Sequence, residues 1–543
     1  MRVVEWSTPL LLLVATTGCG AGDADTPPPP ADIAFATIGA LSGANGRGSF
    51  RFGAASAATQ IEDENENTDW FVFTQPEDQG GLGKGTFVGE ASRGYSMALG
   101  DVALLSEMGL DAYRFSISWA RVEPQRDAID EAALAHYGAF IDALIAAGIR
   151  PMITLHHFSN PRWVDDPLDV DCDSGPGDAN LCGFGHPTGG PLVIEEMRQH
   201  AELLANRFGD RVDEWATINE PINYMVASYG LGAFPPGKSR LFEMLEEFLP
   251  TLFDYARGHA AMYQAIKAND AVDADSDGDP ASVGLTLSVA DWVPARFNEI
   301  SSDPEDLGAL ERIRYVYHYL LIDMLQAGML DTDLDGEFDQ DAPELAGTLD
   351  WLGVQYYFRT GVTGNNGLIP VVELTPCILT FDFGACVAPT DPSFCVPAMK
   401  YEYYPAGLYN VLAELASRWP DLPLLVSESG IATEVGDRRA ESIVRSLEQI
   451  ERARTDGIDV RGYYHWSLYD NFEWAEGFGP RFGLYRVDYS DYARSPTAGA
   501  TVLGEIATQR MLTGARRQTH GGDGPMTLED PQKPPLALCN QAQ

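Results

Sequence analysis

Short apolar stretches that end abruptly in polar residues alternate along the chain with segments of helical periodicity. The stretches predict eight strands, at residues 50–56, 110–119, 150–157, 215–220, 283–289, 351–357, 424–428 and 460–466. Nearly continuous apolar strands separated by helices are typical of a parallel sheet. Eight such units predict an α/β fold, a (β/α)₈ TIM barrel in a single domain with long loops over residues 49–515. An open, doubly wound sheet is disfavoured because no Gly-x-Gly-x-x-Gly turn follows the first strand.

The two ends of the chain differ in composition from this barrel. Residues 1–18 join Arg2 to a short apolar core and predict a signal peptide, and the residues around Cys19 resemble a bacterial lipoprotein cleavage box. Residues 19–48 are small, polar and proline-rich and predict a disordered tether, while residues 516–543 predict an extended C-terminal tail. We therefore expect an exported protein, either a cell-envelope lipoprotein or a secreted protein. A cytoplasmic protein is the remaining alternative.

The charge balance narrows the choice of partners. The chain carries 80 Asp and Glu residues against 36 Lys and Arg residues, a formal net charge of −44. A surface this acidic repels phosphate backbones, so nucleic acid is excluded as a partner. No stretch after the N-terminal segment approaches the roughly 20 apolar residues of a membrane-spanning helix. Contact with a membrane is therefore expected only through a lipid on Cys19.

Two acidic segments begin like calcium-binding loops. Their regularly spaced aspartates are Asp273, Asp275 and Asp277 in the first segment and Asp331, Asp333 and Asp335 in the second. The twelfth position, where a bidentate glutamate completes such a loop, holds Gly284 in the first and Ala342 in the second. Solvated acidic loops are therefore the favoured interpretation and calcium binding is the alternative. No cofactor is expected.

Six cysteines follow Cys19, at Cys172, Cys182, Cys377, Cys386, Cys395 and Cys539. An even number in an exported chain predicts disulfide bonds, with buried free thiols as the alternative. Cys172 and Cys182 lie in one loop and are expected to pair with each other. Cys539 is expected to pair with one of the remaining three, and the other two with each other.

Two of the predicted strands end in a carboxylate. Pro221 cannot donate a hydrogen bond to a sheet, so the fourth strand stops there and leaves Asn219 and Glu220 at its C-terminal end. The seventh strand ends in Glu428. Parallel barrels place their chemistry at the C-terminal ends of their strands, although a loop carboxylate is often only solvated. Retaining glycoside hydrolysis requires two carboxylates, one to protonate the leaving oxygen and one to attack the anomeric carbon.

Longer motifs give these carboxylates a context. The most specific motif is Trp466-Ser467-Leu468-Tyr469-Asp470-Asn471-Phe472-Glu473-Trp474; another is Asn219-Glu220-Pro221, followed by Phe234-Pro235-Pro236-Gly237. Over residues 49–511 the chain resembles family 1 glycoside hydrolases, the β-glucosidase and β-galactosidase family, and it is nearest to the archaeal-type β-glycosidases. The resemblance implies that Glu220 is the acid/base and Glu428 the nucleophile. It also implies that Arg114 and Tyr357 hold and orient the nucleophile.

The same resemblance implies a set of sugar-binding residues, namely Gln60, His157, Asn219, Trp466, Glu473, Trp474 and Phe482. Polar groups in this set suit sugar hydroxyls, and flat aromatic faces suit the C–H bonds of a sugar ring. The chain departs from the family pattern at Gln355 and Ser429, where the family has asparagine. It departs again at Phe158, where the family has tryptophan.

Several functions are compatible with this pattern. The leading hypothesis is a retaining exo-β-glycosidase, β-glucosidase-like, that hydrolyses terminal non-reducing β-D-glycosyl residues of β-linked glycosides or oligosaccharides by double displacement. A transglycosylating glycosidase uses the same intermediate and stays open. A phospho-β-glycosidase is disfavoured because the Glu473 carboxylate repels a sugar phosphate. A catalytically dead, carbohydrate-binding surface barrel is the alternative outside enzymes, and the presence of both Glu220 and Glu428 speaks against it.

Overall fold

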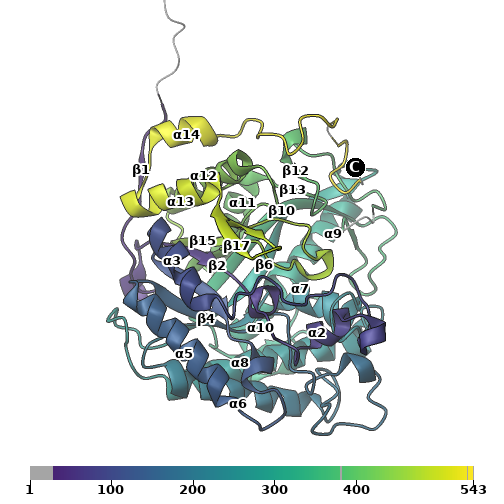
Figure 1. The fold of residues 1–543 in the computed structure, drawn as a ribbon. Coiled ribbons are helices and arrows are strands. Elements are labelled where there is room, and N and C mark those ends of the chain that lie inside the picture. Colours follow the sequence, from purple (N-terminus) through teal and green to yellow (C-terminus); the bar gives the residue numbers. More distant parts are fainter. Residues whose placement is uncertain (1–28, 379–381, 535, 542–543) are drawn as a thin grey trace, which may run out of the picture.

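Eight parallel strands close into a barrel in the computed structural model, which describes residues 29–378, 382–534 and 536–541 (Figure 1). The barrel strands are β2 (Arg51–Ala55), β3 (Ala112–Ser116), β4 (Arg150–His156), β5 (Glu214–Asn219), β6 (Ser282–Arg296), β10 (Trp351–Thr363), β14 (Leu424–Ser429) and β15 (Val460–Trp466). The barrel is closed because β15 pairs in parallel with β2. The predicted (β/α)₈ TIM barrel is therefore confirmed.

Helices surround the barrel, and the labels in Figure 1 place them around its outer face. The longer ones are α3 (Ala98–Met108), α5 (Glu131–Ala146), α6 (Gly190–Phe208), α8 (Leu249–Asn269), α9 (Pro304–Arg314), α10 (Leu320–Ala327), α11 (Pro405–Arg418), α12 (Gly436–Thr455) and α13 (Ala498–Gln509). Local signals set their ends. For example, the Asp130 side chain accepts from two backbone N–H groups at the start of α5, and Gly109, at a φ of 63°, ends α3.

Short elements fill the loops between these units. The short helices are α1 (Ala58–Ile61), α2 (Asp69–Thr74), α4 (Trp119–Val122), α7 (Pro221–Met225) and α14 (Gly514–His520), with π-helical turns at Val226–Gly230, Met244–Phe248 and Tyr315–Tyr319. The short strands are β1 (Ile33–Ala34), β7 (Glu299–Ile300), β8 (Met329–Leu330), β9 (Gln340–Asp341), β11 (Thr375–Pro376), β12 (Cys395–Val396), β13 (Tyr401–Glu402), β16 (Tyr485–Asp488), β17 (Ala493–Pro496) and β18 (Met511–Leu512).

Two barrel strands run well past their predicted ends. β6 and β10 stay paired beyond the barrel mouth, from Arg359 opposite Asp291 to Val362 opposite Pro294. The antiparallel strands β7 and β11 extend this pairing at its edges. The predicted strands at 283–289 and 351–357 are therefore too short, because the extension carries polar residues and a proline that interrupt the apolar pattern. The extended ribbon stands beside the C-terminal mouth of the barrel, where β5 and β14 end.

The segment before the barrel is packed against it. Ile33 pairs with Leu512 of β18, and the ring of Phe35 lies 4.8 Å from that of Phe50. The Arg461 guanidinium donates to the backbone carbonyls of residues 40–43. The prediction of a disordered tether through residue 48 is therefore wrong for residues 33–48. The physical reason is that these residues are held through their backbone carbonyls by a buried arginine, and amino-acid composition does not reveal backbone hydrogen bonds. The predicted signal peptide lies outside the described residues.

Leu41 plugs the N-terminal end of the barrel. It is 1% exposed and packs in one cluster with residues at or near the starts of five strands and with Tyr464, namely Ala112, Met152, Ala216, Trp351, Leu425 and Tyr464. We expect Leu41→Ala to lower the free energy of unfolding by about 2–5 kcal/mol, since it leaves a cavity in a closed core. Chemical denaturation monitored by tryptophan fluorescence measures it. Leu99→Ala, at a leucine that is 53% exposed on α3, is the control. Equal losses for the two variants would contradict the plug.

The C-terminal segment is partly helical and fastened to the barrel. Residues Gly514–His520 form α14, which lies beside β1 in Figure 1, so the predicted extended tail is wrong for its first turns. Beyond it, the Arg445 guanidinium donates to the backbone carbonyls of Gly524 and Pro525. All the predicted disulfides are present, as Cys172–Cys182, Cys377–Cys386 and Cys395–Cys539. The last of these ties the end of the chain to β12.

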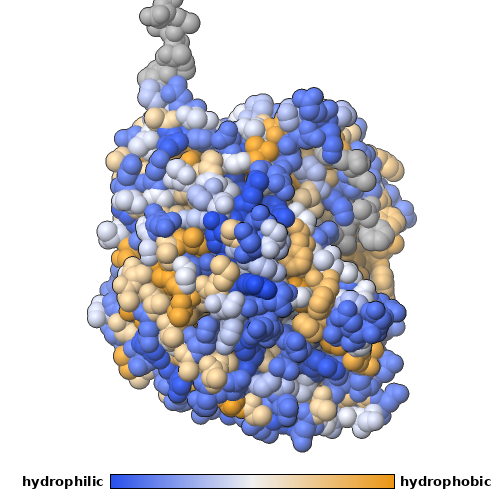
Figure 2. All heavy atoms as spheres, viewed as in Figure 1, coloured by the Kyte–Doolittle hydropathy of each residue, from blue (hydrophilic) through white to orange (hydrophobic). Residues whose placement is uncertain are grey.

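The surface is largely polar. Hydrophilic residues cover most of the face in Figure 2, and apolar side chains occur on it in small groups. Within the described part of the chain, no helix is both long enough and apolar enough to span a membrane.

Candidate active site

Two buried glutamates stand at the C-terminal ends of β5 and β14. Glu220 follows β5 directly in a left-handed conformation, at a φ of 40°, and Pro221 begins α7 behind it. Its backbone N–H donates to the Thr286 carbonyl of β6 at 2.8 Å, which holds the turn. Glu428 is the fifth residue of β14. The two side chains belong to residues that are 7% and 4% exposed, so neither is simply a solvated loop carboxylate.

A cation and a hydroxyl hold the Glu428 carboxyl in place. The Arg114 guanidinium from β3 donates to its Oε1, and the Tyr357 hydroxyl from β10 donates to its Oε2 at 2.8 Å. Arg114 is fixed in turn by Thr154, which accepts from its Nε at 2.9 Å. Burial raises the pKa of Glu428, whereas the Arg114 charge and the two hydrogen bonds oppose that rise. The predicted pair of nucleophile-orienting residues is therefore in place around Glu428.

Glu220 is held in a different state. Burial, and then the negative charge of Glu428, raise its pKa to about 8. The Asn223 side chain donates to its Oε2 at 2.7 Å. At neutral pH this environment keeps Glu220 protonated while Glu428 faces a fixed cation. An acid and a nucleophile that are both carboxyl groups usually stand in different surroundings, which give them different pKa values.

Asn219 contacts residues that hold both glutamates, Arg114 beside Glu428 and Thr286 beside Glu220. Its side-chain Oδ1 accepts from Arg114 at 2.6 Å, from the Thr286 hydroxyl at 2.8 Å and from the Gln355 amide at 2.8 Å. These three donors fix the orientation of the amide, and none of them uses its Nδ2. Gln355 stands where the resembling family has asparagine, and its longer side chain serves here to position Asn219.

Two polar side chains of the predicted sugar site, those of Gln60 and His157, have buried atoms without a hydrogen-bond partner. Gln60 donates to the Phe472 carbonyl at 2.8 Å and to Glu473 at 3.3 Å, and its Oε1 is buried without a partner. The Nδ1 of His157 is also buried without a partner. Burial and the nearby Arg114 charge hold the pKa of His157 well below its usual value, so the ring is neutral. Buried polar atoms of this kind are normally satisfied, which points to a polar ligand.

Glu473 completes this polar group. Burial, followed by the charges of Glu428 and Glu220, raises the pKa of Glu473 to about 8. All three carboxyl groups therefore act on one another electrostatically, which places Glu473 with the two catalytic candidates at the barrel mouth. The sequence prediction brought these three residues to one site from three different strand ends.

Aromatic rings wall the same region. The ring of His157 lies 5.9 Å from Trp466 and 6.0 Å from Trp474, each at 30° to it. Trp474 packs on Phe158 at 5.3 Å, and Phe482 stands edge-on to Tyr357 at 5.9 Å. Trp466, Trp474 and Phe482, three of the predicted sugar-binding residues, thus lie near His157 and Tyr357.

Four residues near the site were not predicted. Asn223 lies on α7, Ser288 on β6, Tyr317 on a π-helical turn and Tyr401 on β13. The hydroxyl of Tyr401 is buried without a partner, and the charge of Glu473 acts on it. Only Asn223 had a sequence signal, its position three residues after Glu220. The other three come from a strand without a recognised motif and from long insertions.

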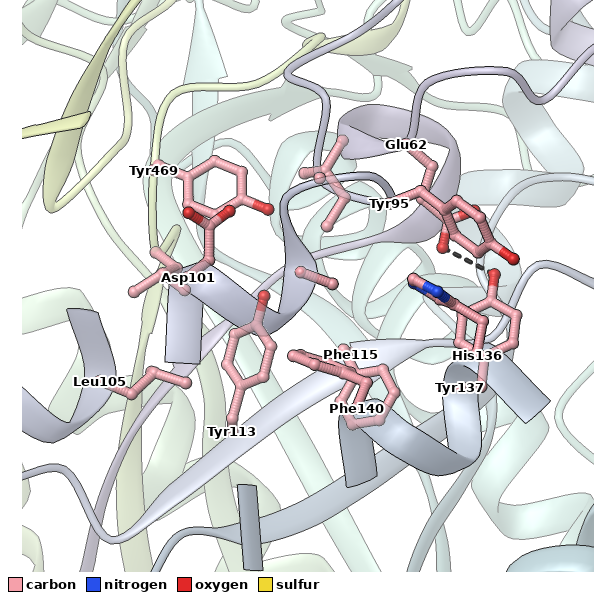
Figure 3. Close-up of a pocket in the computed structure, with 14 residues that line it drawn as sticks. Glu62, Tyr95, Asp101, Leu105, Tyr113, Phe115, His136, Tyr137, Phe140 and Tyr469 are labelled. Atoms are coloured by element: carbon pink, nitrogen blue, oxygen red, sulfur yellow. Dashed lines mark hydrogen bonds between the residues drawn. The ribbon is translucent and has the colours of Figure 1, made fainter. Parts of the chain in front are cut away.

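A small cavity lies elsewhere, between the barrel and the helices α3 and α5 (Figure 3). Its volume is about 30 Å³, enough for a water molecule and far too small for a sugar ring. Its lining includes Tyr95, Asp101 and His136, and the Tyr137 hydroxyl donates to Glu62 at 2.7 Å across it. The cavity is a feature of the outer core and contains none of the predicted site residues.

The acidic loops are only partly gathered into clusters. Asp273 and Asp275 meet Asp213, with one carboxylate oxygen of each within 4.8 Å of the others, while Asp277 instead pairs with Arg150 at 3.0 Å. The second cluster consists of Asp331, Asp333 and Asp335. Arg150 also pairs with Asp275 at 2.6 Å, so a protein cation already balances part of the first cluster. Solvated loops stay the favoured interpretation of both segments, and calcium binding stays the alternative.

The fold and the site together define a (β/α)₈ barrel with two buried carboxyl groups at the C-terminal ends of its strands. A family model described as glycosyl hydrolase family 1 matches residues 45–511. A β-galactosidase from Pyrococcus woesei is 29% identical over 511 residues, covering 86% of this chain and 97% of that protein. Coniferin β-glucosidase from Pinus contorta is 28% identical over 497 residues, covering 83% and 90%. The chain belongs to glycosyl hydrolase family 1.

Solved structures agree with this assignment. A β-glycosidase from Pyrococcus horikoshii superposes with a TM-score of 0.72 at 28% identity, covering 89% of this chain and 98% of that one. The family 1 β-glucosidase from Thermotoga maritima, at 22% identity and a TM-score of 0.68, shares the fold over 85% of this chain. The predicted resemblance and the predicted glycoside hydrolase class are therefore confirmed.

Proposed function

We propose that this glycoside hydrolase is a retaining exo-β-glycosidase that removes terminal β-D-glycosyl residues by double displacement. The observation that carries the proposal is the opposite treatment of the two glutamates. Glu428 faces Arg114 and Tyr357 as a carboxylate, and Glu220 is kept protonated by burial and by the charge of Glu428. A retaining mechanism needs these two states in its first step.

The two half-reactions use these states in order. In the first, Glu220 gives its proton to the leaving oxygen while Glu428 attacks the anomeric carbon and forms a glycosyl ester. Once Glu428 is esterified its negative charge is gone, so the ionised form of Glu220 becomes easier to reach. In the second, Glu220 accepts a proton from water as the water displaces Glu428 and releases the sugar.

The exo mode of action is supported by the polar group around Glu473. Gln60 and His157 carry buried atoms without partners, and these atoms suit the hydroxyls of one terminal sugar. Trp466, Trp474 and Phe482 supply apolar faces for its ring. The relatives are named β-galactosidase and coniferin β-glucosidase, so glucose and galactose are the first sugars to test. A panel of nitrophenyl glycosides on the purified protein identifies the preferred sugar, and no turnover on any β-glycoside would refute the proposal.

We expect the first product to be the β-anomer of the sugar. Two successive displacements at the anomeric carbon restore the starting configuration, whereas a single displacement by water inverts it. Proton NMR of the anomeric signals during the first minutes of hydrolysis of a β-glycoside measures this. Prompt appearance of the α-anomer before mutarotation would assign an inverting mechanism, and the nucleophile role of Glu428 would then be wrong.

The proposal includes action outside the cytoplasm. Three disulfides join six cysteines of the described chain, and disulfides persist chiefly in oxidising compartments. The predicted signal peptide supports the same location. Cell fractionation, with detection of the mature N-terminus by mass spectrometry, distinguishes a lipid-modified Cys19 from a secreted chain.

A further inference from the structure

The end of the fifth barrel strand, β6, reaches the acid/base candidate Glu220. Ser288 is 6% exposed and lies on this strand two residues after Thr286, whose carbonyl accepts the Glu220 backbone N–H at 2.8 Å. Its hydroxyl lowers the pKa of Glu220 and so favours the ionised carboxylate. The Tyr317 hydroxyl donates to Ser288 Oγ at 3.0 Å. Tyr317 sits on the π-helical turn Tyr315–Tyr319 between α9 and α10, and such turns are frequent at functional sites. A line of three polar groups therefore runs from the π-helical turn to Glu220.

The chemistry of these groups decides which of them donates and which accepts each hydrogen bond. An ionised carboxylate accepts hydrogen bonds and cannot donate them, so Ser288 must donate its proton to Glu220 in that state. The oxygen of Ser288 is then free to accept from Tyr317. Burial raises the pKa of Tyr317, so its hydroxyl keeps the proton that it donates. Asn223 adds a second donor from α7, on Glu220 Oε2 at 2.7 Å.

The other groups that face Glu220 do not stabilise its ionised form by a hydrogen bond. The charged and titratable ones are Arg114 of β3, Tyr357 of β10, Glu428 of β14 and Glu473 of the loop after β15. Burial and the Glu428 carboxylate disfavour ionisation of Glu220. Arg114 favours it, but its guanidinium is already engaged with Glu428 and Asn219.

We propose that Asn223 and the Ser288–Tyr317 pair are positioning residues that hold the Glu220 carboxyl and stabilise its ionised form for the second half-reaction. This inference rests on the proposed function, because it assigns the two donors to one step of that mechanism. The donors matter least in the first half-reaction, when Glu220 is protonated. They matter most when Glu220 must act as a base toward water.

The test separates the two half-reactions. On a 2,4-dinitrophenyl β-glycoside, with glucose or galactose as the sugar, the leaving group needs no acid and the second half-reaction limits kcat. We expect Ser288→Ala to lower kcat on it about tenfold, the effect of losing one hydrogen bond to a charged group, and to leave kcat/KM unchanged. Asn223→Leu should behave in the same way.

Tyr317→Phe tests whether the tyrosine acts through the serine. It should lower kcat by about threefold, less than Ser288→Ala, since it removes a hydrogen bond to the donor and not the donor itself. The double variant Ser288→Ala/Tyr317→Phe should be no slower than Ser288→Ala alone. Tyr315→Phe is the matched control, because Tyr315 lies on the same π-helical turn and its hydroxyl bonds Asp331 instead. Additive losses, or an equal loss in Tyr315→Phe, would overturn the assignment.

The pH dependence of the rate distinguishes these roles from a merely structural one, because a variant that only weakens packing would not shift it. Removing donors from the carboxylate disfavours its ionised form, so the pKa of Glu220 rises from about 8 in Ser288→Ala and Asn223→Leu. On a glycoside with a poor leaving group, which needs Glu220 as the acid, the alkaline limb of kcat/KM should therefore move upward by about one pH unit. An unmoved limb together with an unchanged kcat on the dinitrophenyl glycoside would overturn the proposal.

A direct titration separates this inference from the proposed function. Carbon-13 NMR of side-chain-labelled glutamate, with Glu220→Gln to assign the signal, measures the pKa of Glu220 without turnover. An inactive wild-type protein whose Glu220 pKa still rises in Ser288→Ala would refute the proposed function and keep the donor set. An active wild-type protein with the same pKa in all variants would keep the function and refute the donor set.

Discussion

Replacing Glu428 by glutamine is expected to abolish turnover, with kcat reduced by about 10⁴-fold or more, the scale of loss when a covalent nucleophile is removed. The amide has nearly the shape of the carboxylate but cannot form the glycosyl ester. Arg114 and Tyr357 lose their ionised partner. The predicted sugar-binding residues Gln60, His157 and Glu473 are unchanged. Sugar binding should therefore survive. Steady-state rates on a nitrophenyl glycoside and calorimetric titration with the product sugar measure the two effects.

Glu214→Gln is the matched control for this variant. Glu214 is also a buried glutamate on a barrel strand, 2% exposed, and it is paired with Arg51 in the way that Glu428 is paired with Arg114. It stands at the start of β5, however, at the opposite end of the barrel. Its replacement should lower stability and leave kcat near the wild-type value. Near-normal turnover of Glu428→Gln would remove Glu428 from the nucleophile role, and an equal loss in both variants would attribute the effect to folding.

The barrel could be predicted because its strands are buried on both faces. All eight predicted strands overlap the observed ones, and β15 has the predicted bounds, Val460–Trp466. The failures have a common cause in contacts that a local pattern does not contain. Residues 33–48 look like a tether by composition, but Arg461 and the barrel core hold them in place. The added length of β6 and β10 depends on their pairing with each other beyond the barrel.

The catalytic candidates could be predicted because each ends a strand inside a recognisable motif. Their supporting residues could not, since they are defined by proximity in space. Gln355 was a departure of unknown role until its bond to Asn219 Oδ1 gave it one. Ser288 and Tyr317 are 29 positions apart in sequence and meet only because a π-helical turn brings the tyrosine over β6. The protonation state of Glu220 likewise depends on Glu428, which is remote in sequence.

Replacing Glu220 by alanine is expected to slow hydrolysis in a way that depends on the leaving group. Without the acid, glycosides with poor leaving groups should lose about 10²–10⁴-fold in kcat/KM. A dinitrophenyl glycoside leaves without protonation and should keep most of its kcat/KM, so the glycosyl ester on Glu428 forms and accumulates. The shorter side chain opens space beside the ester, and azide should enter it and form a β-glycosyl azide. A burst of dinitrophenolate followed by a slow phase that azide accelerates measures this.

Glu220→Gln is the companion variant that separates charge from space. It removes the acid but fills the same volume, and the Asn223 amide still faces it, so azide should accelerate its slow phase far less than that of Glu220→Ala. The product also reports on stereochemistry, because azide that attacks an α-linked ester on Glu428 yields the β-azide. An α-glycosyl azide, or losses that are the same for good and poor leaving groups, would contradict the acid/base role of Glu220 and the double displacement together.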